Sequence, residues 1–352
     1  TVDLKGDLTL LGDGTNLITV KGDGTPTLFT VNVSDGKALN LGSAAAPSLG
    51  GNLGEAHITL GNNSSLNAVA GNYTVGAVTG GGVVSSSAGG NLVAEVIGEV
   101  GNVGAVKASQ GSIHSNGHIH TDTLTIEGGV VSSGSDIYVD QPVNDMNGTL
   151  TATGNISLHA GATSARGQIV TDGDLILGGD ITKAADGQLT LRAQQGTIEA
   201  ANITATNVAA KKLAASGAVA VDGGVLNLTG TGTDASTVKS LTLTNGTQAT
   251  VADLKLTGTT GTTGTTGTIT VGSESDTVGG TTLSAQHIDL NGGMLLVDPA
   301  WGLASSNVAV ENLSAGGATD VVVNGRVGVG QNSYLALGTA DTGWLPGVVG
   351  NY

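Results

Sequence analysis

The stretch Leu189-Thr190-Leu191 alternates apolar and polar side chains, and turn residues follow it within a few positions. The same alternation recurs at Leu8-Thr9-Leu10, Leu124-Thr125-Ile126, Leu226-Asn227-Leu228, Leu241-Thr242-Leu243 and Leu254-Lys255-Leu256. Alternation with period two predicts a β-strand that buries one face against a core. Because no helical stretch separates the runs, their repetition predicts stacked β-strand coils rather than an ordinary globular domain.

The composition supports a narrow aliphatic core. The chain has 60 glycines among its 352 residues, but only one Phe, two Trp and four Tyr. Globular cores normally depend on bulky aromatic side chains, so here Val, Leu, Ile and Ala must fill the interior. With 39% hydrophobic residues the chain can bury such a core, and it is therefore not expected to be disordered.

Charge and cysteine content limit the partners. The formal net charge is −16, and only 12 residues are basic. An acidic surface repels nucleic acid and anionic membranes, so binding to either is not expected. There is no cysteine, and folding therefore requires no disulfide chemistry. No apolar stretch approaches the roughly 20 residues that span a bilayer.

The rhythm of short runs and turns continues along the whole sequence and predicts one elongated domain over residues 1–352. The spacing fits coils of very roughly 20 to 25 residues with two or three strands each. Tandem Gly-Thr-Thr repeats near 258–268 contain no apolar side chain, and they predict an exposed, flexible loop. Three of the seven aromatic residues, Tyr334, Trp344 and Tyr352, lie near 330–352, where we expect a C-terminal cap over the core.

Three segments have the look of haemagglutinin-type repeats: Gly154-Asn155-Ile156-Ser157-Leu158-His159-Ala160-Gly161, Thr171-Asp172-Gly173-Asp174-Leu175-Ile176-Leu177 and Gln188-Leu189-Thr190-Leu191-Arg192-Ala193-Gln194-Gln195-Gly196. In these repeats the chain resembles the passenger domains of bacterial type V secreted proteins, the autotransporters and the filamentous-haemagglutinin group. The resemblance lies in the general repeat pattern and covers nearly the whole chain. It implies an all-β fold, a right-handed parallel β-helix (β-solenoid).

The resemblance also implies export through the outer membrane of a Gram-negative bacterium and display on the cell surface. Such a passenger needs a C-terminal β-barrel translocator or a two-partner transporter. No barrel is present in this sequence, and we expect the chain to be a piece of a longer protein. The Gly-Asp-Ser-Gly motif of protease passengers does not occur either, so that activity is not inferred.

Three residues form a candidate metal site. If the segment from His114 to Asp122 is a strand, then His118, His120 and Asp122 point to one face, about 6.5 to 7 Å apart along the chain. Two imidazoles and a carboxylate are a plausible ligand set for zinc or nickel. Alternate polar positions on any solvent-facing strand would give the same pattern, so both interpretations stay open.

Acidic turns offer a second candidate ion site. Gly and Asp occur together at Asp13, Asp23, Asp172, Asp174 and Asp180. Stacked turns can align carboxylates, which are the hard oxygen ligands that calcium prefers. The glycine-aspartate nonapeptide of calcium-binding β-rolls is missing, however, and both residues are good turn formers in their own right. No cofactor is expected.

The enzymatic alternative is a polysaccharide lyase or a glycosidase. Asp136 and Asp140 flank Tyr138 and suggest a sugar-contacting patch, although the same residues also suit a solvated strand and turn. Arg166, Arg192 and Arg326 are the only arginines, and aromatic platforms for sugars are few. We therefore expect the protein not to be an enzyme.

The expected function is adhesion by a rigid rod. Rows of Thr, Ser, Asn and Asp on successive coils form hydrogen-bonding ladders, and many weak contacts along such a face give avidity. The partner would be the same protein on a neighbouring cell, giving autoaggregation, or a host glycan or matrix protein. The alternative is a passive structural stalk or surface-layer component that holds a recognition tip elsewhere.

Overall fold

The structure is a computed structural model, and it describes residues 1–11, 13–16, 29–45, 50–53, 56–99, 101–257, 267–273, 276–278, 280–290, 294–297, 307–313, 326–329, 334–337 and 345–346. Nearly all regular structure in these residues is β-strand, and the one helical element among them is a short 3-10 turn, η1 (Gly232–Asp234). No helix in these ranges is long and apolar enough to cross a membrane. The chain divides into two compact units, Thr1–Ile176 and Leu177–Tyr352, and each is described by itself. The single domain expected over 1–352 stays a prediction.

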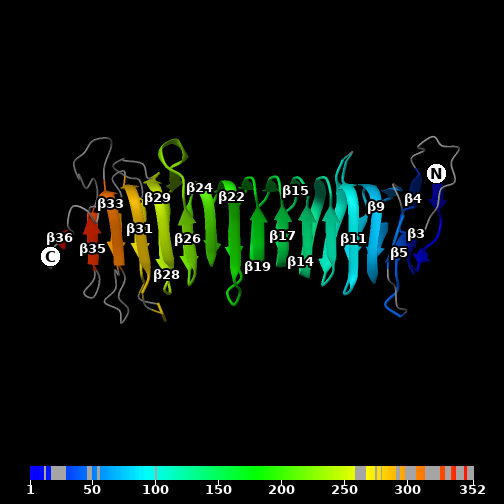
Figure 1. The fold of residues 1–352 in the computed structure, drawn as a ribbon, viewed down its shortest axis with the longest axis horizontal. Helices are drawn as coiled ribbons and strands as arrows, with labels where there is room; N and C mark the ends of the chain where they lie inside the picture. The colour runs from blue at the N-terminus through cyan, green and yellow to red at the C-terminus, as the bar shows by residue number, and fades with distance from the viewer. Residues whose placement is uncertain are drawn as a thin grey trace. The chain divides into compact units, whose positions relative to one another are not determined.

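The first unit is built from short parallel strands, coloured blue to green in Figure 1. They are β1 (Val2–Leu4), β2 (Leu8–Leu10), β3 (Asp13–Asn16), β4 (Thr30–Val33), β5 (Ala38–Leu41), β6 (Gly50–Asn52), β7 (His57–Leu60), β8 (Ser65–Ala68), β9 (Gly71–Gly80), β10 (Val83–Ser86), β11 (Gly90–Ile97), β12 (Val103–Ser109), β13 (Ser112–Ser115), β14 (Ile119–Ser133), β15 (Ile137–Val139), β16 (Val143–Asn144), β17 (Asn147–Ala152), β18 (Ile156–Leu158) and β19 (Ala162–Thr171), with β20 (Leu175–Leu177) at the boundary.

The strands of the second unit follow the same plan, green to red in Figure 1. They are β21 (Ile181–Lys183), β22 (Leu189–Ala200), β23 (Ile203–Ala205), β24 (Asn207–Ala215), β25 (Ala218–Asp222), β26 (Val225–Leu228), β27 (Ser236–Val238), β28 (Ser240–Thr244), β29 (Gln248–Leu256), β30 (Thr268–Val271), β31 (Thr282–Asp289), β32 (Met294–Val297), β33 (Asn307–Leu313), β34 (Arg326–Val329), β35 (Tyr334–Leu337) and β36 (Leu345–Pro346).

Parallel pairing between successive coils defines a β-solenoid in each unit. In the first unit, β4, β5 and β6 make one coil, and they pair in parallel with β7, β8 and β9 of the next. In the second unit, β25 pairs in parallel with β23 on one side and with β28 on the other. The prediction of an all-β parallel β-solenoid is therefore confirmed.

The core consists of columns with one apolar residue from each coil. Leu39 pairs with Leu66, Leu66 with Val84, and Val84 with Val106, and each of these side chains is at most 1% exposed. Alternate residues point outward, as the burial of β5 and β8 shows. Burying an aliphatic side chain of this size stabilises the fold by about 1.5–3 kcal/mol. The aliphatic interior was predicted; Tyr73, which is 1% exposed, is an aromatic exception to it.

The length of a coil varies more than expected. Ile137 pairs with Ile156 in a short coil, whereas the pairing of Ala249 with Leu283 encloses a much longer one. Strands keep the apolar columns aligned, so the variation falls in the turns and excursions between them. One such excursion carries η1 between β26 and β27.

Two sequence predictions fall largely outside the described residues. Of the Gly/Thr loop near 258–268, only Gly267 and Thr268 are described; Gly267 is buried and Thr268 begins β30. Of the aromatic cap near 330–352, the structure describes β35 and β36, which pair in the antiparallel sense. The flexibility of the loop and the closing of the core by aromatic residues stay predictions.

Candidate functional site

A cluster of aromatic, imidazole and carboxylate groups lies on the outer surface of the first unit. It contains Asn102, His120, Asp122, Asp136, Tyr138 and Asp140, and we call it the Tyr138 patch. β14 and β15 place it, because Ile119 and Ile137 of these strands are fully buried and the next residue of each therefore faces outward. In this register His120 lies directly beside Tyr138.

Tyr138 contacts two other members of the patch, His120 and Asp136. Its ring meets the His120 ring edge to face, with centroids 5.8 Å apart and an interplanar angle of 64°. The Tyr138 hydroxyl donates a hydrogen bond to Oδ2 of Asp136 at 3.2 Å. Partial burial and the Asp136 charge raise the pKa of the phenol above its ordinary value. The residue is still 39% exposed, so part of it can contact a ligand.

Asn102 links two of the carboxylates of the patch, those of Asp122 and Asp140. Nδ2 of Asn102 donates hydrogen bonds to Oδ1 of Asp122 and, at 2.7 Å, to Oδ2 of Asp140. Nε2 of His120 lies 3.4 Å from the Asp140 carboxylate. Two carboxylates one coil apart therefore share an amide donor, and one of them also faces an imidazole.

The predicted metal ligands have separate partners. His118 Nε2 lies 3.3 Å from the carbonyl oxygen of Gly98, whereas His120 faces Asp140 and Asp122 accepts from Asn102. Within the ranges that the structure describes, no group of three or more His, Asp or Glu side chains is placed to hold a metal ion. A metal role for His118, His120 and Asp122 stays a prediction that this geometry does not favour.

The acidic turns show bonding between coils where they are described. Oδ1 of Asp180 accepts hydrogen bonds from the backbone N–H and Nδ2 of Asn202, at 3.1 and 2.8 Å. The backbone N–H of Asp174 donates to Oδ1 of Asn155 at 2.8 Å. Asp172 has other interactions, the side chain of Asp13 is not described, and Asp23 lies outside the described residues. Asp180 thus stabilises a turn, and calcium binding by this group stays a prediction.

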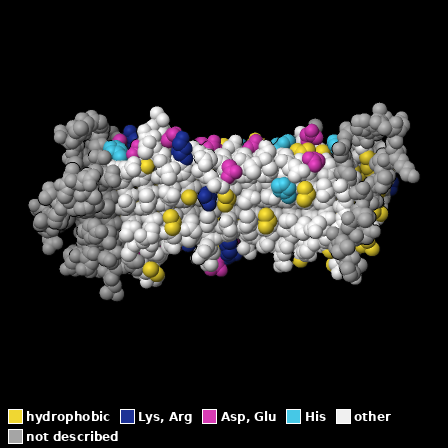
Figure 2. Space-filling model, in the orientation of Figure 1, with side chains coloured by type: hydrophobic (Ala, Val, Ile, Leu, Met, Phe, Trp, Pro, Cys, Tyr) yellow, Lys and Arg dark blue, Asp and Glu magenta, His cyan; other side chains and the backbone are white. Residues whose placement is uncertain are grey.

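Outward-facing amides form the predicted polar ladders. In one ladder of the first unit, Asn91 Nδ2 donates to Asn72 Oδ1 and Ser112 Oγ donates to Asn91 Oδ1, both at 2.7 Å. Asn40, Asn67 and Ser85 form a second ladder in the same way. On the face in Figure 2, hydrophobic side chains of the described residues occur as separate spots rather than as one patch.

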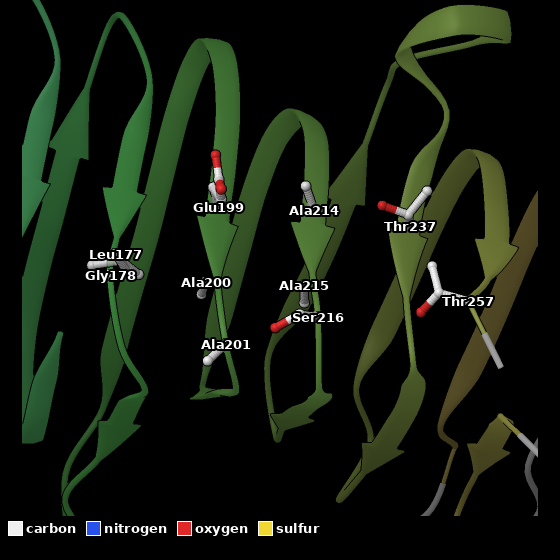
Figure 3. A pocket seen from close by; sticks show the side chains of 10 residues that line it. All are labelled: Leu177, Gly178, Glu199, Ala200, Ala201, Ala214, Ala215, Ser216, Thr237 and Thr257. Carbon is white, nitrogen blue, oxygen red and sulfur yellow. The ribbon is translucent and has the colours of Figure 1, made fainter. Parts of the chain in front are cut away.

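An open groove of about 540 Å³ lies on the second unit. Figure 3 shows small side chains, among them Ala200, Ala215 and Ser216, along successive coils, with Glu199 to one side. Among the described residues, Glu199 is the one acidic residue that lines this groove. Glycoside hydrolysis generally requires a pair of carboxyl groups, and this lining supplies a single one.

Sequence reasoning found most of the Tyr138 patch, but as two unrelated segments. His120 with Asp122, and Asp136 with Tyr138 and Asp140, were separate predictions. The structure brings them together because Ile119 pairs with Ile137 of the next coil. Asn102 was missed, since nothing in the sequence reveals which asparagine of the preceding coil stands beside two carboxylates.

Comparisons with known families, curated proteins and solved structures find no match for this chain. The class that the structure defines is the parallel β-solenoid, an architecture consistent with a passenger domain.

Proposed function

We propose that this chain is a passenger-type adhesin or autoaggregation factor displayed on the surface of a Gram-negative bacterium. The observation that supports it most directly is the outward-facing Asn72–Asn91–Ser112 ladder, a row of hydrogen-bonding groups on successive coils in which Asn72 is exposed and the other two are half-buried. Each amide and hydroxyl keeps further bonding capacity after its bond to the next coil. A matching row on another molecule would add bonds of about 1 kcal/mol each, and a long row would sum them.

The partner in this proposal is the same protein on a neighbouring cell, with a host glycan or matrix protein as the alternative. Homotypic pairing of ladders requires only what this chain already carries. A glycan would find an exposed aromatic residue and hydrogen-bonding side chains at the Tyr138 patch. Export would use a β-barrel translocator or a two-partner transporter. A passive stalk is the second candidate, because coil-to-coil ladders also stabilise a rod that binds nothing.

The test is display of the chain on a non-adherent bacterium, with settling of the culture as the readout. We expect clumping that the purified chain abolishes by competition. The variant Asn72→Ala/Asn91→Ala/Ser112→Ala should reduce clumping, whereas Asn227→Ala, an exposed asparagine of β26, should not. Circular dichroism of each purified variant establishes that the fold is retained.

Each outcome separates the candidates. No clumping by the displayed wild type would reject homotypic adhesion. Binding of that strain to a glycan or matrix-protein screen would then support the heterotypic partner, and failure in both assays would favour the stalk. Release of reducing sugar or unsaturated product from a polysaccharide panel would overturn the adhesin in favour of an enzyme.

A further inference from the structure

A polar hollow lies at one corner of the second unit, apart from the ladders and the Tyr138 patch. Its volume is about 480 Å³, within the range of sites that hold small molecules. Six side chains line it together with the backbone of three glycines: Lys183, Gln188, Thr206, Asp222, Asn245 and Val278.

The stacking of coils creates the hollow. Lys183 ends β21 and Asp222 ends β25, and the coil between them contributes Ala205 and then Thr206. These side chains are small and almost wholly buried, so the lysine passes over them. Its Nζ reaches Oδ2 of Asp222, two coils away, at 2.8 Å. Thr206 of the intervening coil therefore lines the hollow together with Lys183 and Asp222 of the coils on either side.

The two charged side chains that line the hollow, Lys183 and Asp222, are paired, and the Asp276 carboxyl nearby also interacts with Asp222. The Lys183 side chain is only 14% exposed and that of Asp222 is 32% exposed, so both depend on their mutual contact. Asp222 Oδ1 also accepts from Thr244 Oγ1 at 3.1 Å and from Asn245 Nδ2 at 2.5 Å. A phosphate or sulfate entering here would meet the Asp222 carboxylate, and a metal cation would meet the lysine. The pair therefore selects against strongly charged ligands of either sign.

The remaining groups suit a ligand that both donates and accepts hydrogen bonds. The exposed Gln188 amide carries both kinds of atom, and the Lys183 ammonium has donors beyond the one used by Asp222. Asn245 adds one remaining N–H, because its Nδ2 donates to Asp222 and its Oδ1 accepts from the backbone N–H and the hydroxyl of Thr277. Val278, which is 57% exposed, provides an apolar side. Sugar rings combine hydroxyl groups that donate and accept with an apolar C–H face. We propose that this hollow binds one monosaccharide unit of a neutral glycan.

The experiment uses the purified full chain and saturation-transfer difference NMR. The probes are the methyl glycosides of glucose, galactose and mannose, together with N-acetylglucosamine. We expect saturation transfer to at least one of them. Gln188→Ala should weaken its binding roughly 3- to 10-fold, the effect of losing one or two hydrogen bonds. Asp222→Asn should abolish binding. The Lys183 ammonium then loses its charged partner and competes with the sugar for the amide oxygens.

Matched variants keep the result interpretable. Gln188 is exposed, so its loss should leave the fold intact even if Asp222→Asn does not fold. Gln141→Ala removes an exposed glutamine from the first unit and should leave affinity unchanged. Absence of transfer to all four sugars would overturn the proposal, as would binding that Gln188→Ala leaves unaltered. Saturable binding of inorganic phosphate or Ca²⁺ that Gln188→Ala weakens would overturn the neutral-ligand assignment. Because no cells are involved, this result is separate from success or failure of the adhesion assay.

Discussion

Asn67 donates a hydrogen bond from Nδ2 to Oδ1 of Asn40, 2.8 Å away in the preceding coil, while its own Oδ1 accepts from Ser85 Oγ at 2.7 Å in the following coil. Each amide in such a ladder therefore has a defined orientation, with its donor toward the N-terminal coil and its acceptor toward the C-terminal coil. The Asn72–Asn91–Ser112 ladder has the same direction. An external partner must bind the donors and acceptors that are not used between coils. A ladder therefore has a direction along the solenoid as well as a regular spacing.

Removing a rung should destabilise the first unit modestly. Asn67→Ala deletes bonds to both neighbouring coils, and at about 1 kcal/mol for each we expect a loss of about 2 kcal/mol. Urea unfolding followed by circular dichroism measures it. Thr59→Ala, at an exposed position of β7, is the control and should change stability by less than about 0.5 kcal/mol. Equal effects of the two substitutions would contradict a stabilising role for the ladder.

Gly167 should not tolerate a side chain. Its φ is +98°, and a Cβ there would lie 2.0 Å from the carbonyl oxygen of Gly148. Gly167→Ala should lower stability by at least about 1–3 kcal/mol, the usual cost of such a backbone conformation without the added clash.

Two further glycines distinguish the effect of the positive φ from the effect of the steric clash. Gly89 has φ +80° but open space around its Cβ position, and Gly6 has open space without a positive φ. The expected order of destabilisation in thermal melts is Gly167→Ala, then Gly89→Ala, then Gly6→Ala. If Gly167→Ala were as stable as Gly6→Ala, this result would contradict the close approach of Gly167 to Gly148 of the preceding coil.

The apolar columns should respond more strongly than the ladders. Ile156 is fully buried and stacks on Ile137, so Ile156→Ala should cost about 2–5 kcal/mol. Ser157→Ala changes the adjacent outward-facing position and is the matched control. Hydrogen exchange should show lost protection first in the coils that contact Ile156, because each coil contacts mainly its neighbours. Uniform loss of protection across the first unit would contradict that local response.

Stability should depend on the charge of Asp222 in acid. Hydrogen bonds from Asn245 and Lys183 lower the pKa of this carboxyl below its ordinary value of 3.8. A depressed folded-state pKa contributes stability above the unfolded-state pKa, and the contribution is lost as the pH falls through the folded value. The urea midpoints of wild type and Asp222→Asn should therefore differ at about pH 7, and the difference should shrink as the pH is lowered below the ordinary value of 3.8. A difference that stays constant over this range would exclude the charge as its cause.

Autoaggregation, if it follows the proposed function, should strengthen with salt. The chain carries a net charge of −16, and like charges oppose face-to-face pairing. Raising ionic strength from about 0.01 to 0.15 M shortens the Debye length from about 30 to 8 Å, so displayed cells should settle faster. Lowering the pH toward the sequence pI of about 4.4 should act in the same direction. Settling rates indifferent to both conditions would argue against polar ladders as the adhesive element.

The sequence was sufficient to predict what depends on local pattern. Alternation at Leu124 and Ile126 correctly placed both side chains inside, and outward polar residues were expected to form ladders. What the sequence did not reveal depends on register between coils. Tyr138 lies beside His120 only because the turns between them have a particular length, and turn lengths vary along the chain. Lys183 pairs with an aspartate two coils away, a distance that no local pattern encodes.

The pairing of Ile137 with Ile156 and the pairing of Leu150 with Ile169 span the same interval of sequence. An in-frame tandem duplication of the gene segment that encodes one such coil would present every new strand with a partner already in register. Deletion of the same segment would rejoin the coils on either side without a change of frame or of exposed face. This part of the chain can therefore gain or lose length in evolution by recombination alone, with no compensating substitutions in its core.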